Sequence, residues 1–310
     1  MIEEGGECVK RALERPQHAT LDAYGARYNR VVSSPSESLS ETPPWMWPNL
    51  LSLDAPAVAV VWALLFARAR GVFLSAATMG ALALAVWLIY LGDRVLDGWR
   101  MHETDELRQR HIFCTRHRAI LIAAAAVALF GGAWLARDAL SISEAKAGLR
   151  MCGCVGIYMI CVHAGGETVE RLLPKEIVVG LIFAAGTALP IWSEGGFPRR
   201  ALASWALFGL LCALNCVAIE CWENQGSLAS PILTLADRHI GWVAAGIALA
   251  AQIAHFCLAT NGVVAGTIAV AAGLIFVLDC LRGRLSVAAL RVLVDAALAI
   301  PAVFAILDRL

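Results

Sequence analysis

Long apolar runs separated by short polar breaks occupy the chain from Trp45 to its end. A membrane-spanning helix needs about 20 mostly apolar residues. Nine runs approach that length, and they do not alternate strictly between apolar and polar positions. Because only helices and closed barrels satisfy their backbone hydrogen bonds in lipid, the pattern predicts an all-α polytopic membrane protein with about nine transmembrane helices. The runs cover residues 54–68, 72–92, 118–136, 147–163, 176–193, 201–221, 240–258, 262–280 and 288–307.

The first part of the chain differs from the rest. Residues 1–45 are polar and include the Ser- and Pro-rich stretch 33–38. No apolar run follows the basic residues there, so the pattern does not indicate a cleavable signal peptide. We predict a flexible polar tail over residues 1–45 and a transmembrane helical domain over residues 46–310.

Basic residues are distributed unevenly between the two ends of the predicted spans. With the N-terminus inside the cell, the cytoplasmic ends carry about twice as many Lys and Arg residues as the opposite ends, which is the bias that the positive-inside rule describes. The distribution therefore predicts an N-in/C-out orientation.

Composition agrees with a membrane protein and excludes several other classes. Of the 310 residues, 59% are hydrophobic and 16% are charged, and the mean hydropathy is +0.68. Soluble domains carry about 25% charged residues, so this chain has too few to coat its surface. Its 25 basic and 25 acidic residues balance, which leaves no basic field for nucleic acid. Most of the ten cysteines lie in apolar stretches, where cysteine acts as a small hydrophobic residue.

A first group of polar side chains lies where the second run reaches the predicted cytoplasmic side. Asp93 and Asp97 are four residues apart, so both carboxylates project from one helix face, and Tyr90 lies about one turn earlier. Carboxylates at a cavity mouth suit Mg²⁺, which prefers oxygen ligands and often bridges to substrate phosphates. The alternative is a helix end at the membrane surface, in which the aspartates pair with Arg94 and Arg100.

A second carboxylate pair, Glu220 and Glu223, lies at the corresponding end of the sixth run. The two pairs together indicate a shared cavity, although glutamates that reach out to water would give the same pattern. Cationic side chains lie on the same side, among them Arg108, Arg116 and Lys175. Such groups would neutralise a diphosphate and stabilise it as a leaving group. Orientation by the positive-inside rule, or contact with anionic lipids, is the alternative explanation.

Two further aspartates have local explanations. Asp54 precedes Ala55 and Pro56 at the start of the first run, which is typical of a helix N-cap followed by a first-turn proline. Asp295 lies inside the ninth run, four residues after Arg291, so we expect an internal ion pair between these two side chains.

The order of these features resembles the UbiA superfamily of intramembrane prenyltransferases, whose members have nine spans and aspartate-rich motifs after spans two and six. The last two aspartates of the first family motif, N-D-x-x-D-x-x-x-D, fall on Asp93 and Asp97. Residues 223–226 approximate the end of the second motif, and Glu220 supplies a second carboxylate there. An L-D-x-P sequence common at the first span of the family matches residues 53–56.

The resemblance extends over residues 48–308 and implies chemistry on a prenyl diphosphate and a hydrophobic acceptor within the bilayer. Family enzymes ionise the allylic C–O bond with the help of Mg²⁺, and an acceptor captures the carbocation or the prenyl chain cyclises. The resemblance also implies a site that faces the cytoplasm, in the inner (plasma) membrane of a bacterium. On this chain the metal ligands would be Asp93, Asp97, Glu220 and Glu223, the diphosphate-binding residues Arg94, Arg108, Arg116 and Lys175, and the catalytic residues Tyr90, Asp93 and Asp97.

Ile89 and Tyr90 replace the Asn-Asp pair that opens the family motif, which removes one metal ligand. A second hypothesis is therefore a non-catalytic membrane protein that keeps the bundle and binds an isoprenoid or another lipid. A third is a secondary transporter, although the chain shows neither the inverted repeats nor the broken midplane helices frequent in such folds.

Overall fold

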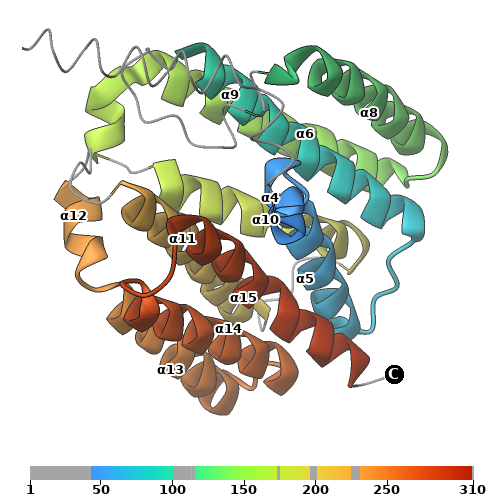
Figure 1. Ribbon diagram of the computed structural model, residues 1–310. Helices are drawn as coiled ribbons and strands as arrows, with labels where there is room; N and C mark the ends of the chain where they lie inside the picture. Colours follow the sequence, from blue (N-terminus) through green and yellow to red (C-terminus); the bar gives the residue numbers. More distant parts are fainter. Residues whose placement is uncertain are drawn as a thin grey trace, which may run out of the picture. The chain divides into compact units, whose positions relative to one another are not determined.

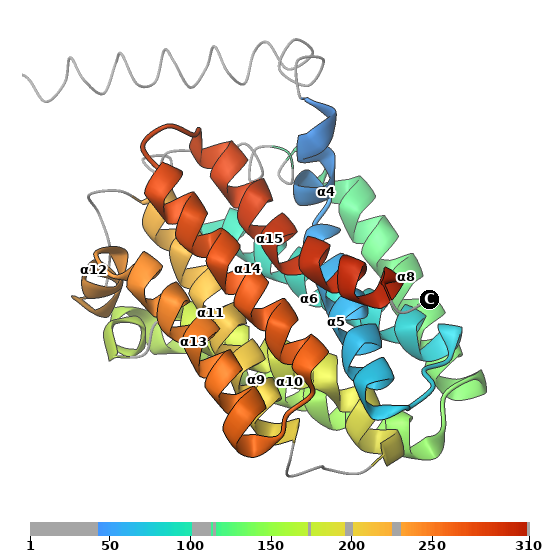
Figure 2. The same ribbon diagram turned by 90° about the horizontal axis from the view of Figure 1, so that it is seen from below.

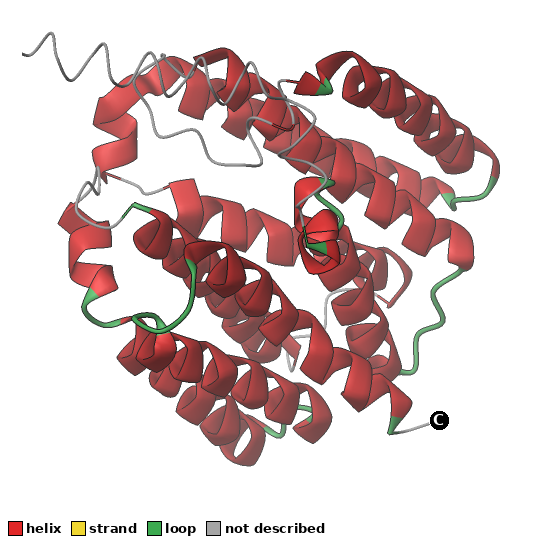
Figure 3. Cartoon of the chain, viewed as in Figure 1, coloured by secondary structure: helices red, strands yellow, loops and turns green. Residues whose placement is uncertain are grey.

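The computed structural model describes residues 43–100, 113, 116–172, 175–195, 201–224 and 231–308, without the side chains of 96–100, 162–172 and 194–195. Every regular element in these residues is a helix (Figure 3), which confirms the all-α prediction for them. The chain divides into two units after Trp47. The first contains a short 3₁₀ helix, η1 (Pro44–Met46), and the predicted tail lies almost wholly outside the described residues.

Each of the nine predicted runs overlaps a long helix of the second unit, Pro48–Leu310, and the run 72–92 begins four residues before its helix. Among the described residues, seven helices are long and apolar enough to cross a membrane, and an eighth crossing results if α5 and the helical segment before it count as one span. The protein is therefore a polytopic helical membrane protein, whereas nine spans and the N-in orientation stay predictions. The long helices are α5 (Asp54–Arg70), α6 (Ala76–Arg100), α8 (Arg118–Asp138), α9 (Ile142–Leu172), α10 (Lys175–Gly195), α11 (Leu202–Glu223), α13 (Ile240–Leu258), α14 (Gly262–Leu281) and α15 (Val287–Leu307), and two short ones are α4 (Trp47–Leu50) and α12 (Pro231–Asp237).

The helices of the second unit form a bundle in which α5 and α15 lie side by side (Figures 1 and 2). α5 also packs against α6 and α10, and α11 contacts α10, α13, α14 and α15 from within the bundle. α8 and α9 lie at the edge, because α8 packs mainly against α6 and α9 mainly against α10. The bundle therefore has a packed part around α11 and a looser part around α8 and α9.

Local signals explain where several helices start and stop. α5 ends at Gly71, whose φ of +64° lies in the left-handed region that glycine tolerates best. α14 begins after Asn261, whose side chain accepts hydrogen bonds from the backbone N–H groups of Val263 and Val264. The Ser286 hydroxyl accepts from the N–H of Ala289 in the same way before α15. These caps satisfy backbone donors that a helix leaves free at its first turn.

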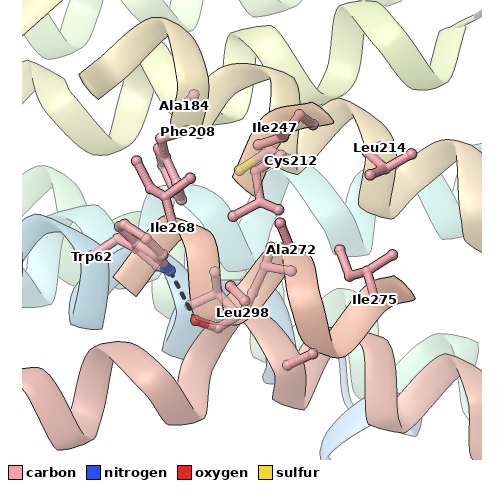
Figure 4. Packing of buried hydrophobic residues seen from close by; sticks show 14 of the residues in the cluster. Trp62, Ala184, Phe208, Cys212, Leu214, Ile247, Ile268, Ala272, Ile275 and Leu298 are labelled. Carbon is pink, nitrogen blue, oxygen red and sulfur yellow. Dashed lines mark hydrogen bonds between the residues drawn. The ribbon is translucent and has the colours of Figure 1, made fainter. Parts of the chain in front are cut away.

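Aromatic side chains fix α5, α11 and α15 together in the packed part (Figure 4). The Trp62 ring stacks on Phe208, with ring centroids 4.3 Å apart, and the ring of Phe66 meets Phe208 edge-on at 5.4 Å. The Trp62 indole N–H donates to the carbonyl oxygen of Leu298 over 3.0 Å, which satisfies its polar atom inside the core.

α10 and α11 approach each other closely because Gly180 has no side chain. A Cβ atom at Gly180 would lie 2.3 Å from the backbone nitrogen of Ala213, well inside van der Waals contact. This glycine is therefore required for the observed packing of the two helices.

A polar contact joins α6 and α9 near their N-terminal ends. The Thr78 hydroxyl donates to Glu144 Oε1 over 2.8 Å, and the other Glu144 oxygen accepts from the backbone N–H of Ser141 over 2.9 Å. Further along the two helices, a cavity lies between them.

Candidate functional site

A cavity lies between α6, α9 and α10, and together with the open space at its mouth it measures about 650 Å³ (Figure 1 shows the three helices). Tyr90 and Asp93, both predicted as site residues, line it together with Ile89. Asp93 is exposed and Tyr90 is half-buried. The structure therefore brings two predicted catalytic residues to the wall of one cavity, whose other lining residues are Val86, Met151, Val155, Tyr158, Met159, Val179, Ile182, Phe183 and Gly186.

Aromatic hydroxyl groups add polar atoms to this largely apolar cavity. The Tyr158 hydroxyl donates to the backbone carbonyl of Lys175 over 3.4 Å, so the start of α10 lies next to the cavity. The Tyr90 ring meets the Phe183 ring edge-on, with centroids 6.4 Å apart, which fixes the tyrosine on the cavity wall. The lining from α9 and α10 was missed from sequence; Tyr158, an isolated tyrosine in an apolar run, is the signal that was available.

The predicted glutamates do not line this cavity. Glu223 forms an ion pair with Arg291 of α15, with Oε1 and Nη1 2.5 Å apart, and both side chains are largely buried. Glu220 accepts a hydrogen bond from the Asn224 side chain at the end of the same helix. The expected ion pair between Arg291 and Asp295 is wrong, because Arg291 reaches across to α11 and binds Glu223 instead.

Arg94, a predicted diphosphate ligand, is only 6% exposed. Its Nη1 donates to the backbone carbonyls of Asn49 over 2.7 Å and Leu50 over 3.2 Å. These bonds hold Asn49 and Leu50, at the C-terminal end of α4, against α6. Its role in diphosphate binding stays a prediction.

The remaining predicted cationic residues are more scattered. Lys175 is half-buried and opens α10 beside the cavity, whereas Arg116 is exposed just before α8. Arg108 lies outside the described residues. Of these three, Lys175 is the one whose backbone carbonyl contacts a residue of the cavity wall, Tyr158.

The residues present are compatible with a magnesium ion carried by a substrate. Mg²⁺ is commonly held by one or two carboxylates together with substrate phosphates, and Asp93 offers one carboxylate at the cavity. Among the described side chains, no group of three or more His, Cys, Asp or Glu residues could hold a metal ion. The side chain of Asp97 lies outside the described set, so the predicted four-carboxylate site is not tested.

A second polar group, not predicted from sequence, lies between α5 and α15. The Asp54 and Asp295 carboxyl groups are within hydrogen-bonding reach of each other, and Asp295 accepts from the Asn215 side chain over 3.0 Å. The N-cap prediction for Asp54 is wrong, because Leu53 is the N-cap and Asp54 is the first residue of α5. The Asp54 carboxylate accepts from the backbone N–H of Ala55 and also belongs to this long-range cluster.

No known family model, no characterised protein and no solved structure matches this chain. The resemblance to the UbiA superfamily therefore rests on the order of spans and the residues of its motifs.

Proposed function

We propose that this protein is an intramembrane enzyme that acts on a prenyl diphosphate in the cavity between α6, α9 and α10. The observation that carries the proposal is that Tyr90 and Asp93 line a mostly apolar cavity. Ligand sites typically have apolar walls and a few placed polar groups. A prenyl diphosphate matches such a site, because its apolar chain suits the apolar walls and its charged head group suits the polar groups.

The substrate chain would lie along Val155, Ile182 and Phe183, with the head group near Asp93. Mg²⁺, when bound, would supply the positive charge that makes diphosphate a good leaving group. We expect the Asp93 carboxylate to hold the metal on the protein side. The Tyr90 hydroxyl would donate to a phosphate oxygen, or its ring would stabilise an allylic cation. Lys175 would neutralise the departing diphosphate.

The cavity walls would also have to exclude water, because an allylic cation reacts readily with it. The apolar side chains from α9 and α10 would exclude water until a hydrophobic acceptor or a double bond of the same chain captures the cation. Asp97, Glu220 and Glu223 are further candidate ligands, and Glu223 would first have to release Arg291. We place the protein in the inner (plasma) membrane of a bacterium, with the site facing the cytoplasm.

A specific observation favours a second candidate function, a non-catalytic isoprenoid- or lipid-binding protein. Ile89, which stands where the family motif has asparagine, lines the cavity and offers no ligand atom. An apolar residue at that place suits binding of a chain without ionisation of its head group.

The test uses purified protein in nanodiscs with geranyl, farnesyl and geranylgeranyl diphosphates. We expect Mg²⁺-dependent release of pyrophosphate, and a loss of about 100-fold in Asp93→Asn, since removal of one group that stabilises developing charge has an effect of this order. Asp308→Asn, an exposed change at the end of α15, is the control and should retain full release. Full metal-dependent release by Asp93→Asn would refute the assigned role of Asp93.

A matched glycine pair tests the cavity itself. A Cβ atom at Gly186, on the cavity wall, meets nothing within 4 Å, and the same holds for Gly131 on α8. Gly186→Leu should weaken binding of the prenyl diphosphate at least about tenfold by filling the space of several methylene groups, while Gly131→Leu should leave it unchanged. If the wild-type protein binds the prenyl diphosphate but releases no pyrophosphate, the result would favour the non-catalytic function.

A further inference from the structure

Two carboxyl groups from distant parts of the chain meet inside the bundle, and neither of them lines the prenyl diphosphate cavity. Asp54 begins α5 and Asp295 lies within α15, and the packing of α5 against α15 brings their side chains within hydrogen-bonding reach. Carboxyl groups within membrane domains are costly, so a close pair requires an explanation.

Neutral donors surround this carboxyl pair. The Asn49 side chain donates to Asp54 Oδ2 over 2.6 Å, and the backbone N–H of Ala55 donates to Asp54 Oδ1 over 2.9 Å. The Asn215 side chain of α11 donates to Asp295 Oδ1 over 3.0 Å. These bonds orient the carboxyl groups without supplying a positive charge.

Arg94 of α6 is the cation that faces the pair among the described side chains, and it interacts with Asp295. Tyr90 of α6 and Cys216 of α11 also interact with the pair, and Glu176 of α10 interacts with Cys216. None of these three side chains can supply a positive charge. Two ionised carboxylates beside one guanidinium would leave one negative charge without a partner. An unbalanced charge of this kind costs several kcal/mol in a low-dielectric interior.

An unused acceptor lies at the same place. Asn215 is only 7% exposed, and its Oδ1 has no hydrogen-bond partner within the described part of the protein. This oxygen belongs to the same amide group whose Nδ2 donates to Asp295. Carboxylate and amide oxygens are the ligands that hard cations prefer, and an O–H donor would satisfy the same oxygen.

We infer that Asp54 and Asp295 bind one exchangeable monovalent cation, H⁺ or Na⁺, with the Asn215 amide as a third polar group. One positive charge shared by the two carboxyl groups balances the cluster together with Arg94. This site does not depend on the proposed prenyl diphosphate chemistry.

Infrared spectroscopy of the purified protein in a detergent without ester groups tests the site at neutral pH. With choline chloride as the only salt, a bound proton gives the carbonyl stretch of a protonated carboxyl group, which moves to lower frequency in D₂O. Asp54→Asn and Asp295→Asn should each lose this band, because the single remaining carboxylate is balanced by Arg94. Asp279→Asn is the matched control and should keep it, since Asp279 is already paired with Arg282.

Replacement of choline by Na⁺ distinguishes the two occupants. If Na⁺ is the occupant, it raises the unfolding temperature of the wild-type protein at constant ionic strength, and this shift is lost in both aspartate variants. If one substitution prevents folding, the wild-type protein and the other variant still decide the test. Wild-type protein with neither a carboxyl band that the variants remove nor a Na⁺-specific shift would overturn the inference.

Discussion

α8 and α11 have nearly the same length and mean hydropathy, yet they occupy opposite environments. In the most apolar stretch of each helix, 6% of the residues of α8 are buried inside the protein, compared with 61% of those of α11. Lipid tails are as apolar as leucine, so hydropathy alone does not separate a helix that faces lipid from one that faces protein. The two helices show that hydropathy predicts entry into the membrane and leaves the position within the bundle open.

The difference lies in the polar and aromatic residues that each helix carries. α11 contains Asn215, Glu220 and Glu223, and all three bond to other side chains. The stretch 119–136 of α8 contains only apolar residues and glycine. Because polar groups in a membrane domain face protein or a water-filled cavity, their presence marks α11 as the interior helix.

A pair of phenylalanine truncations should separate the two helices most strongly. Phe208 on α11 is 0% exposed and stacks on Trp62, whereas Phe130 on α8 is 78% exposed. Phe208→Ala should lower the free energy of unfolding by about 3–5 kcal/mol, because it leaves a cavity in the core. Phe130→Ala should change it by about 0.5 kcal/mol or less. Chemical unfolding in detergent micelles measures both, and similar losses would contradict the contrast.

A lysine on α8 tests whether its exposed face meets lipid. Val127 lies near the middle of the helix and is 73% exposed, and Ile120 near its start is 67% exposed. Val127→Lys should make insertion of α8 less favourable by about 2.5–3.5 kcal/mol, the cost of lysine at a helix centre. Ile120→Lys should be tolerated better, because its amine can reach the headgroups.

The measurement is glycosylation of an acceptor site placed in the loop after α8, which reports the fraction of chains in which this helix is inserted. Equal insertion of both lysine variants would place this face of α8 against water or protein.

Alanine in place of two glycines gives the smallest expected difference. Gly180→Ala puts a methyl group against the backbone of Ala213 and should destabilise the protein by about 1–3 kcal/mol through overpacking. Gly131→Ala on α8 meets open space and should be neutral, or stabilising by up to about 1 kcal/mol through helix propensity. Thermal unfolding midpoints compare the two, and a stabilised Gly180→Ala protein would show that α10 and α11 can separate without loss.

The helices were largely predictable from sequence, but their ends were not. The apolar run 147–163 lies inside α9, which extends from Ile142 to Leu172, and the run 72–92 lies on α6, which continues to Arg100. In both cases the helix continues through polar residues that carry no hydropathy signal. Hydropathy reports the apolar thickness of the membrane, and backbone hydrogen bonds decide the helix length.

Two of the predicted site residues rest on a local signal in the sequence. Tyr90 and Asp93 are neighbours on one helix face, and both line the cavity. The ion-pair prediction was wrong because Arg291 and Asp295 bind partners that are distant in the sequence. Arg291 pairs with Glu223 rather than with Asp295 one turn away, and Asp295 meets Asp54. Spacing along one helix cannot reveal such pairings, because they depend on which helices pack together.

The contact between α5 and α15 can form only after the last helix has been synthesised. Trp62 donates its hydrogen bond to a carbonyl 236 residues further along the chain. At the usual pace of translation, about 5–20 residues per second, roughly 10–50 s separate the emergence of the two partners. For that time the buried face of α5 has lipid, translocon or other helices in place of α15. A chain whose synthesis ends before the last helix therefore has eight of the nine predicted spans. Its core lacks the packing of α15, and Asp54 lacks its partner Asp295.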